Sequence, residues 1–95
     1  MNDIDYERKA EILKTIGHPV RLKIIKGLMR EERCVKNIWS TLGLPQATVS
    51  QHLALLKNKN IVTSQRKGVT MCYAITDETV RQIMDVIENN GHRDD

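Results

Sequence analysis

Five side chains near the middle of the sequence have types that suit hydrogen bonding to the edges of DNA bases. Glutamine can pair with an adenine edge, and serine or threonine can bond to bases or to phosphates. The five residues are Gln46, Thr48, Ser50, Gln51 and His52. A polar helix face is more often only solvated, and His52 could equally be a structural histidine that bonds to a neighbouring helix. The surrounding residues therefore decide between these interpretations.

Those surroundings are strongly basic. No Asp or Glu occurs from Arg33 through Thr76, so all twelve acidic residues lie on either side of that stretch. The same block contains six of the fifteen Lys and Arg residues: Arg33, Lys36, Lys57, Lys59, Arg66 and Lys67. This segregation is typical of a polyanion-binding surface, because a nearby carboxylate would cancel part of the attraction for phosphates. The alternative is a basic face that is merely solvated.

Two cysteines, Cys34 and Cys72, are a second candidate for chemistry. They are too few for a disulfide scaffold, and we expect them to be reduced in the cytosol unless they serve as sensors. Arg33 and Lys36 flank Cys34, and their charges would lower the pKa of its thiol and favour the reactive thiolate. Cys72 falls in an expected strand, where cysteine is usually a small buried hydrophobe. A switch that responds to oxidants, persulfides or soft metals through Cys34, with or without Cys72, stays an alternative to cysteines without a sensory role.

Catalysis finds no support in the sequence. We find no nucleophile and base at a recognisable spacing, no glycine-rich phosphate loop and no cluster of metal ligands. We therefore expect no enzyme activity, no catalytic residues and no cofactor.

Apolar periodicity predicts four helices that position these groups. The first follows Tyr6 and ends at Gly17, the second begins with Pro19, the third ends at Gly43 and the fourth begins at Pro45. Along the fourth helix, one buried stripe is predicted at Val49, Leu53 and Leu56. The five polar residues named above then occupy the opposite face of that helix.

A β-hairpin and a fifth helix complete the chain. Residues 61–65 are predicted as a strand, residues 66–68 as a tight turn and residues 69–75 as the returning strand. Thr76 can cap a last helix that has acidic residues in its first turn and ends at residues 90–91.

The predicted order is ααααββα, a mainly α protein with a small β-hairpin that forms a single domain over residues 1–95. It describes a winged helix-turn-helix, in which the second helix of the unit enters the major groove of DNA. Lys57 and Lys59 at the far end of that helix, with Arg66 and Lys67 in the wing, should contact phosphates or the minor groove and position the protein without reading sequence. A winged helix that contacts protein or RNA is a less favoured alternative.

Length and hydropathy limit the setting of this domain. A chain of 95 residues has a thin core, for which subunit association is a remedy. No apolar run approaches the roughly 20 residues of a membrane span. The amino terminus is acidic and polar where a signal peptide would be basic and then apolar. We expect a cytoplasmic protein with no membrane partner.

Two segments resemble the ArsR (ArsR/SmtB) family of bacterial repressors. They are residues 16–25, IGHPVRLKII, and residues 44–56, LPQATVSQHLALL, and Ile61 and Val62 then follow. The similarity extends from about Ala10 to Ile87. It implies a homodimer, joined through the first and last helices, that binds an imperfect palindrome in the double-stranded DNA of a promoter. It also implies release by an inducer, whose identity the sequence does not reveal.

The implied dimer explains apolar stripes on the terminal helices that one thin core could not fully bury. The expected interface residues are Ile12, Leu13, Val80, Ile83, Met84 and Ile87.

The two metal sites found in many members of the family are incomplete here. Where thiolate sensors carry Cys-Val-Cys, this chain has Cys34-Val35-Lys36. In the site on the last helix Asp77 matches, whereas Thr79, Asn90 and Arg93 stand where the other ligands would lie. We therefore expect no metal site.

Overall fold

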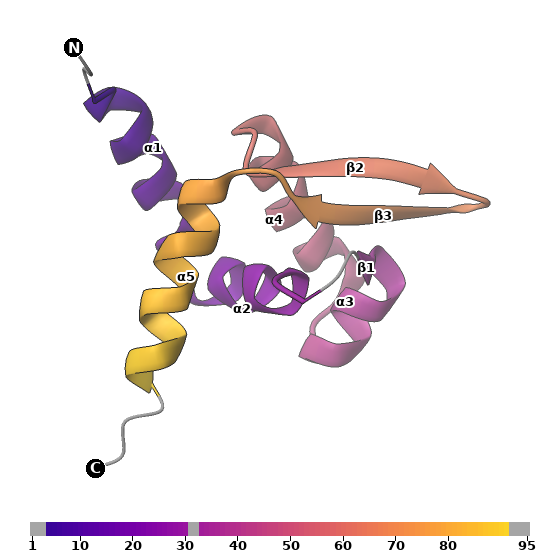
Figure 1. Cartoon of the computed structure of the whole chain (residues 1–95). Coiled ribbons are helices and arrows are strands. Elements are labelled where there is room, and N and C mark those ends of the chain that lie inside the picture. Colours follow the sequence, from indigo (N-terminus) through magenta and orange to yellow (C-terminus); the bar gives the residue numbers. More distant parts are fainter. Residues whose placement is uncertain (1–3, 31–32, 92–95) are drawn as a thin grey trace.

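The computed structural model describes residues 4–30 and 33–91. Within these ranges the elements follow the order predicted for a winged helix-turn-helix, with one short strand added (Figure 1). The helices are α1 (Tyr6–Ile16), α2 (Pro19–Leu28), α3 (Val35–Leu42), α4 (Gln46–Asn58) and α5 (Glu78–Gly91). The strands are β1 (Arg33–Cys34), β2 (Val62–Lys67) and β3 (Thr70–Ile75).

Local sequence sets the ends of the first three helices. Asp5 caps α1 by accepting a hydrogen bond from the Arg8 N–H at 3.0 Å. At the start of α2, the Nδ1 atom of His18 accepts a hydrogen bond from the Val20 N–H at 3.1 Å, next to Pro19 in the first turn. Gly43 ends α3 in the left-handed conformation, at φ 68°. These ends agree with the predicted ones.

The core is built from aliphatic side chains of all five helices and the hairpin. Val49, Leu53 and Leu56 are fully buried along α4, which confirms the predicted stripe. They belong to one apolar cluster with Ile24 and Ile25 of α2, and Trp39 packs against that cluster while partly exposed. Burying one face of α4 leaves its opposite face for solvent or a partner.

The wing is an antiparallel hairpin of β2 and β3 that extends away from the helices (Figure 1). Its pairing continues out to Lys67 opposite Thr70, so the turn consists of Gly68 and Val69. The predicted turn at residues 66–68 was therefore wrong. A two-residue hairpin turn needs positive φ, which Gly68 supplies at 65°. Arg66 and Lys67 consequently lie on the last part of β2.

Strand β1 is an element that the sequence did not predict. It pairs antiparallel with β3, which gives the strand order β1-β3-β2, and its register places Cys34 opposite Cys72. Two residues are too few to show the alternation of apolar and polar side chains by which a strand is predicted.

The cap of α5 also differs from the prediction. Asp77, not Thr76, accepts the hydrogen bond from the Val80 N–H, at 3.0 Å. Thr76 is still held at the base of the hairpin, because its N–H bonds to the Ile61 carbonyl at 3.0 Å. Its hydroxyl instead donates to the Asn60 carbonyl at 3.3 Å.

Among the described residues, no helix has the length and apolar character needed to span a membrane.

Candidate nucleic-acid interface

The solvent-facing side of α4 carries uncharged side chains from its start to Ala54. The exposed residues there are Gln46, Ala47, Ser50, Gln51 and Ala54, which we call the α4 outer face, and exposed Lys57 and Asn58 follow at the carboxyl end. Ala47, Gln51 and Ala54 follow the helical spacing of four and three residues, so they lie in one row. Thr48 is half-buried at its edge. Glutamine and serine on the α4 outer face can bond to base edges, and the alanine methyl groups can contact the methyl group of thymine.

Ala47 and Ala54 were not among the predicted site residues, because small apolar residues do not stand out as binding groups. Their spacing from Gln51 on the predicted helix was the signal that could have identified them.

The amino end of α4 adds an anion-binding feature. Pro45 precedes the helix and its side chain makes no capping hydrogen bond. The first backbone N–H groups of an α-helix have no partner inside the helix, and the helix dipole makes this end positive. A phosphate can therefore bind here without a charged side chain.

His52 points toward α2 rather than belonging to the α4 outer face. Its Nδ1 atom lies 3.2 Å from Arg21 Nη1, and its ring centre is 4.7 Å from that of His18. Arg21 also bonds through Nε to the Thr15 carbonyl. Because arginine can only donate, the His52 Nδ1 atom must accept and carries no proton. The structure thus shows a packing role for His52, and its predicted contact with DNA stays a prediction.

The same surroundings affect the charge of His52. Burial lowers the pKa of this imidazole below 6.5, and the nearby charges of His18 and Arg21 lower it further. His52 is therefore biased toward its neutral form.

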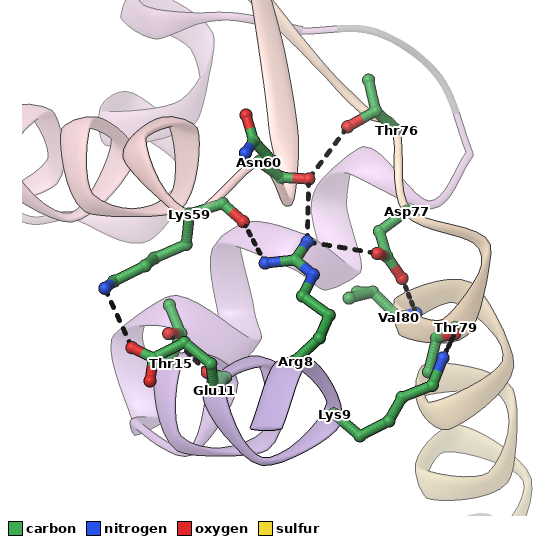
Figure 2. Close-up of polar contacts among 10 residues, drawn as sticks. All are labelled: Arg8, Lys9, Glu11, Thr15, Lys59, Asn60, Thr76, Asp77, Thr79 and Val80. Atoms are coloured by element: carbon green, nitrogen blue, oxygen red, sulfur yellow. Dashed lines mark hydrogen bonds and ion pairs between the residues drawn. The ribbon is translucent and has the colours of Figure 1, made fainter. Parts of the chain in front are cut away.

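The cations predicted to contact phosphates divide into two groups. Lys57, Arg66 and Lys67 are exposed at the end of α4 and on the wing. Lys59 instead forms an ion pair with Glu11 of α1, at 2.9 Å between Nζ and Oε2 (Figure 2). Its predicted phosphate contact stays a prediction, and in this structure a carboxylate of the same chain already pairs with the ammonium group. The side chains of Arg33 and Lys36 lie outside the described residues.

The two cysteines form a disulfide bond. The expectation of a reduced pair is wrong for this structure, because the pairing of β1 with β3 brings residues 38 apart in the chain next to each other. Cys72 is buried, as predicted for a strand cysteine. The bond connects the segment just before α3 to the middle strand of the sheet, so it lies between the two parts of the winged helix.

The residues at the metal-site positions of α5 already have partners within the chain. Asp77 accepts from the Val80 N–H through Oδ1 and pairs with Arg8 through Oδ2, at 3.4 Å. Thr79 accepts a hydrogen bond from Lys9 Nζ at 2.8 Å. Arg93 and the side chain of Asn90 lie outside the described residues. Over residues 4–30 and 33–91, no group of three or more His, Cys, Asp or Glu side chains could hold a metal ion.

The residues expected at a dimer interface are not all accessible. Ile12, Val80 and Met84 are at most 1% exposed, because they face the core of their own chain. Assigning them to an interface was therefore an error of helix face. Besides Tyr6 in the first turn of α1, the exposed large apolar side chains on α1 and α5 are Leu13, Val86 and Ile87, and Ile83 on α5 is half-buried. We call Leu13, Ile83, Val86 and Ile87 the α1–α5 apolar face, and Figure 1 shows both helices at the end of the molecule opposite the hairpin tip.

The amino-acid sequence of this chain is similar to those of known proteins. Residues 18–64 match the family described as bacterial regulatory protein, arsR family. An HTH-type transcriptional regulator of Methanocaldococcus jannaschii is 39% identical over 84 residues, which are 87% of this chain and 94% of that protein.

Two solved structures are also similar to this chain. Transcriptional repressor PagR of Bacillus anthracis is 39% identical over 82 residues, which are 85% of this chain and 82% of that protein. Its crystal structure superposes with a TM-score of 0.80 and covers 86% of this chain and 94% of that one. The transcriptional repressor BigR of Xylella fastidiosa superposes with a TM-score of 0.84 at 28% identity, covering 99% and 100% of the two chains.

Proposed function

The chain belongs to the arsR family of bacterial regulatory proteins, and on that premise we propose that this DNA-binding regulator is a repressor that acts as a homodimer on an inverted-repeat operator. The α4 outer face is the observation that carries the proposal. It presents short neutral hydrogen-bonding groups on one helix, in a stretch of sequence without any carboxylate. Its expected target is the major groove of double-stranded DNA, where such groups can distinguish base pairs.

Contacts to the DNA backbone would hold that helix in register. The free amide groups at the start of α4 can bind one phosphate. Lys57 at the other end of α4 and Arg66 and Lys67 on the wing can bind others or reach the adjacent minor groove. These contacts supply affinity that depends on salt, whereas the α4 outer face supplies sequence preference.

Association through the α1–α5 apolar face would explain an inverted repeat. A two-fold symmetric dimer presents two copies of α4 to half-sites about one helical turn apart. Both terminal helices expose large apolar side chains, which such an interface would bury. The proposed partner is promoter DNA, and we therefore expect the protein to act in the cytoplasm. The proposal requires no metal or cofactor.

Selection of duplexes from a random pool by the purified protein tests this proposal. We expect enrichment of one inverted repeat, and weaker binding to single-stranded RNA of the same sequence. Recovery of duplexes without a shared sequence would contradict base reading by α4. Stronger binding to the RNA would favour the alternative of an RNA-binding winged helix.

A thiol-dependent repressor is the second candidate, and the Cys34–Cys72 bond favours it. Forming this bond from two thiols releases two protons and passes two electrons to an oxidant such as a peroxide, and a dithiol reverses the reaction. Because the bond connects the segment before α3 to the wing strand β3, its state can alter the fit of both to DNA. Operator binding measured with and without a dithiol should differ for the native chain and not for Cys34→Ser. A variant that keeps the difference would contradict this candidate.

A further inference from the structure

Arg8 lies on α1, outside the helix-turn-helix, yet its guanidinium reaches the end of α4 (Figure 2). Its Nη1 atom donates to the Lys59 carbonyl at 2.7 Å, and its Nη2 atom donates to the Asn60 carbonyl at 3.5 Å. The last carbonyl groups at a helix end lack donors of their own, and the dipole there attracts a cation. Arg8 therefore caps the carboxyl end of α4 from a helix 51 residues away in sequence.

The same guanidinium also binds the start of α5. Its Nη2 atom lies 3.4 Å from Asp77 Oδ2, and the Asp77 side chain is only 18% exposed. Because Asp77 Oδ1 caps the first turn of α5, this pair connects the two helix ends. A planar guanidinium can address three acceptors in different directions, whereas a lysine ammonium on a flexible stem acts as a single point charge.

Neighbouring contacts hold the same three segments together (Figure 2). Lys59 pairs with Glu11, and its hydrogen bond and charge lower the pKa of that carboxyl group. Lys9 donates to Thr79 of α5 at 2.8 Å. Arg8, Lys9 and Glu11 thus form successive contacts from α1 to α4 and α5, with Arg8 contacting both.

Arg8 also binds a residue with an unusual backbone conformation at the end of α4. Asn60 has a left-handed conformation, at φ 61°, although it is not a glycine. Its N–H bonds to the Lys57 carbonyl at 3.0 Å, and its carbonyl accepts from Arg8 and Thr76. The next residue, Ile61, is fully buried. Arg8 therefore binds at the point where the path of the chain out of α4 is fixed.

The consequence concerns how α4 is oriented in a dimer, and it rests on the proposed function. The α1–α5 apolar face would meet the partner, while the α4 outer face would meet DNA. We infer that Arg8 is a positioning residue that fixes the angle of α4 to the dimer axis and so sets the half-site spacing that the protein accepts. Any rotation of α4 is doubled by two-fold symmetry, because both copies move.

The experiment compares Arg8→Lys and Arg8→Ala with the native chain on four duplexes. They are the selected operator, the operator with its spacer lengthened or shortened by one base pair, and a single half-site. One base pair moves a half-site by about 3.4 Å and rotates it by about 35°. For the native dimer we expect a loss of about tenfold or more on either altered spacer.

Both Arg8 variants should bind the selected operator about tenfold more weakly but lose less than about threefold further on the altered spacers. Their affinity for the single half-site should stay within about twofold of the native value. Circular dichroism tests whether each variant is folded, and sedimentation tests whether it is a dimer. Arg8→Lys retains the positive charge, so it serves as the test variant if Arg8→Ala does not fold.

Arg81→Lys is the matched control. Arg81 lies on α5 and donates through Nη1 to a carbonyl at the end of α2, that of Met29, at 3.3 Å. It should keep the native preference for spacing. If Arg8→Lys keeps that preference as well, or weakens binding to all four duplexes by the same factor, the inference is overturned. A native chain that selects no sequence would instead overturn the proposed function.

Discussion

Gln51 lies at the centre of the α4 outer face, between the exposed methyl groups of Ala47 and Ala54. Gln51→Ala should weaken operator binding by about 1 to 3 kcal/mol if its amide contacts a base, while binding to random DNA changes little. Titrations of both duplexes at one salt concentration measure the difference. Gln82→Ala, at an exposed position on α5, is the matched control and should affect neither. An equal loss on both duplexes would contradict base reading.

His52 makes stability depend on pH. Its pKa is lowered in the folded chain, chiefly by burial, so the folded state binds this proton less readily than the unfolded state. The stability associated with neutral His52 is thus fully present above about pH 6.5 and is lost as pH falls through the lower folded pKa.

We expect the free energy of unfolding to decrease below that pH in the native chain and to decrease less in His52→Gln. Urea denaturation at a series of pH values measures this slope. The same slope in both proteins would mean that another group takes up the proton.

Among the elements, the wing shows how the register of the hairpin sets the position of its basic residues. Pairing continues to Lys67, so the basic residues lie on β2 while Gly68 and the 98% exposed Val69 form the tip. Arg66→Ala combined with Lys67→Ala should reduce the dependence of log K on log salt by about 0.9 for each phosphate that the wing no longer neutralises, on any duplex. Lys14→Ala with Lys23→Ala removes two exposed cations from α1 and α2 and should leave this slope unchanged. An unchanged slope in the wing variant would exclude wing contacts with the backbone.

Helix α4 is held along its length and at its carboxyl end by other elements. The contacts of His52 with α2 lie along its length, and those of Arg8 and Glu11 from α1 lie at its carboxyl end. Contacts of this kind fix the position of the helix before binding, so less of the binding free energy is needed to order it.

For the whole molecule, the α1–α5 apolar face predicts the state of assembly. Val86→Asp should raise the dimer dissociation constant about tenfold or more, because an unpaired carboxylate buried at an interface costs more than about 1.4 kcal/mol. The monomer should stay folded, since Val86 is 60% exposed. Sedimentation equilibrium measures the constant. Val69→Asp adds the same charge at an exposed valine of the wing and should leave the dimer intact, and a Val86→Asp protein that dimerises normally would place the interface elsewhere.

Much of the fold was predictable because it depends on neighbours in sequence. The buried stripe of α4, the glycine that ends α3, the hairpin and the acid-free block are all patterns of spacing or composition. The resemblance to the ArsR family, carried by residues 16–25 and 44–56, was confirmed by the comparison with known proteins. The DNA-binding roles assigned to Gln46, Thr48, Ser50, Gln51, His52, Lys57, Arg66 and Lys67 stay predictions.

Tertiary packing decided what each side chain faces. A helical period shows that Ile12 and Leu13 lie near an apolar stripe, but only the position of neighbouring helices buries the first and exposes the second. Lys59 was predicted as a phosphate ligand, and only the fold shows that Glu11 lies beside it. The sequence by itself determined where the helices lie and which stretch is basic, because both follow from local order. The fold alone decided which groups pair, because contacts such as Arg8 with Lys59 and Cys34 with Cys72 join residues that are distant in the chain.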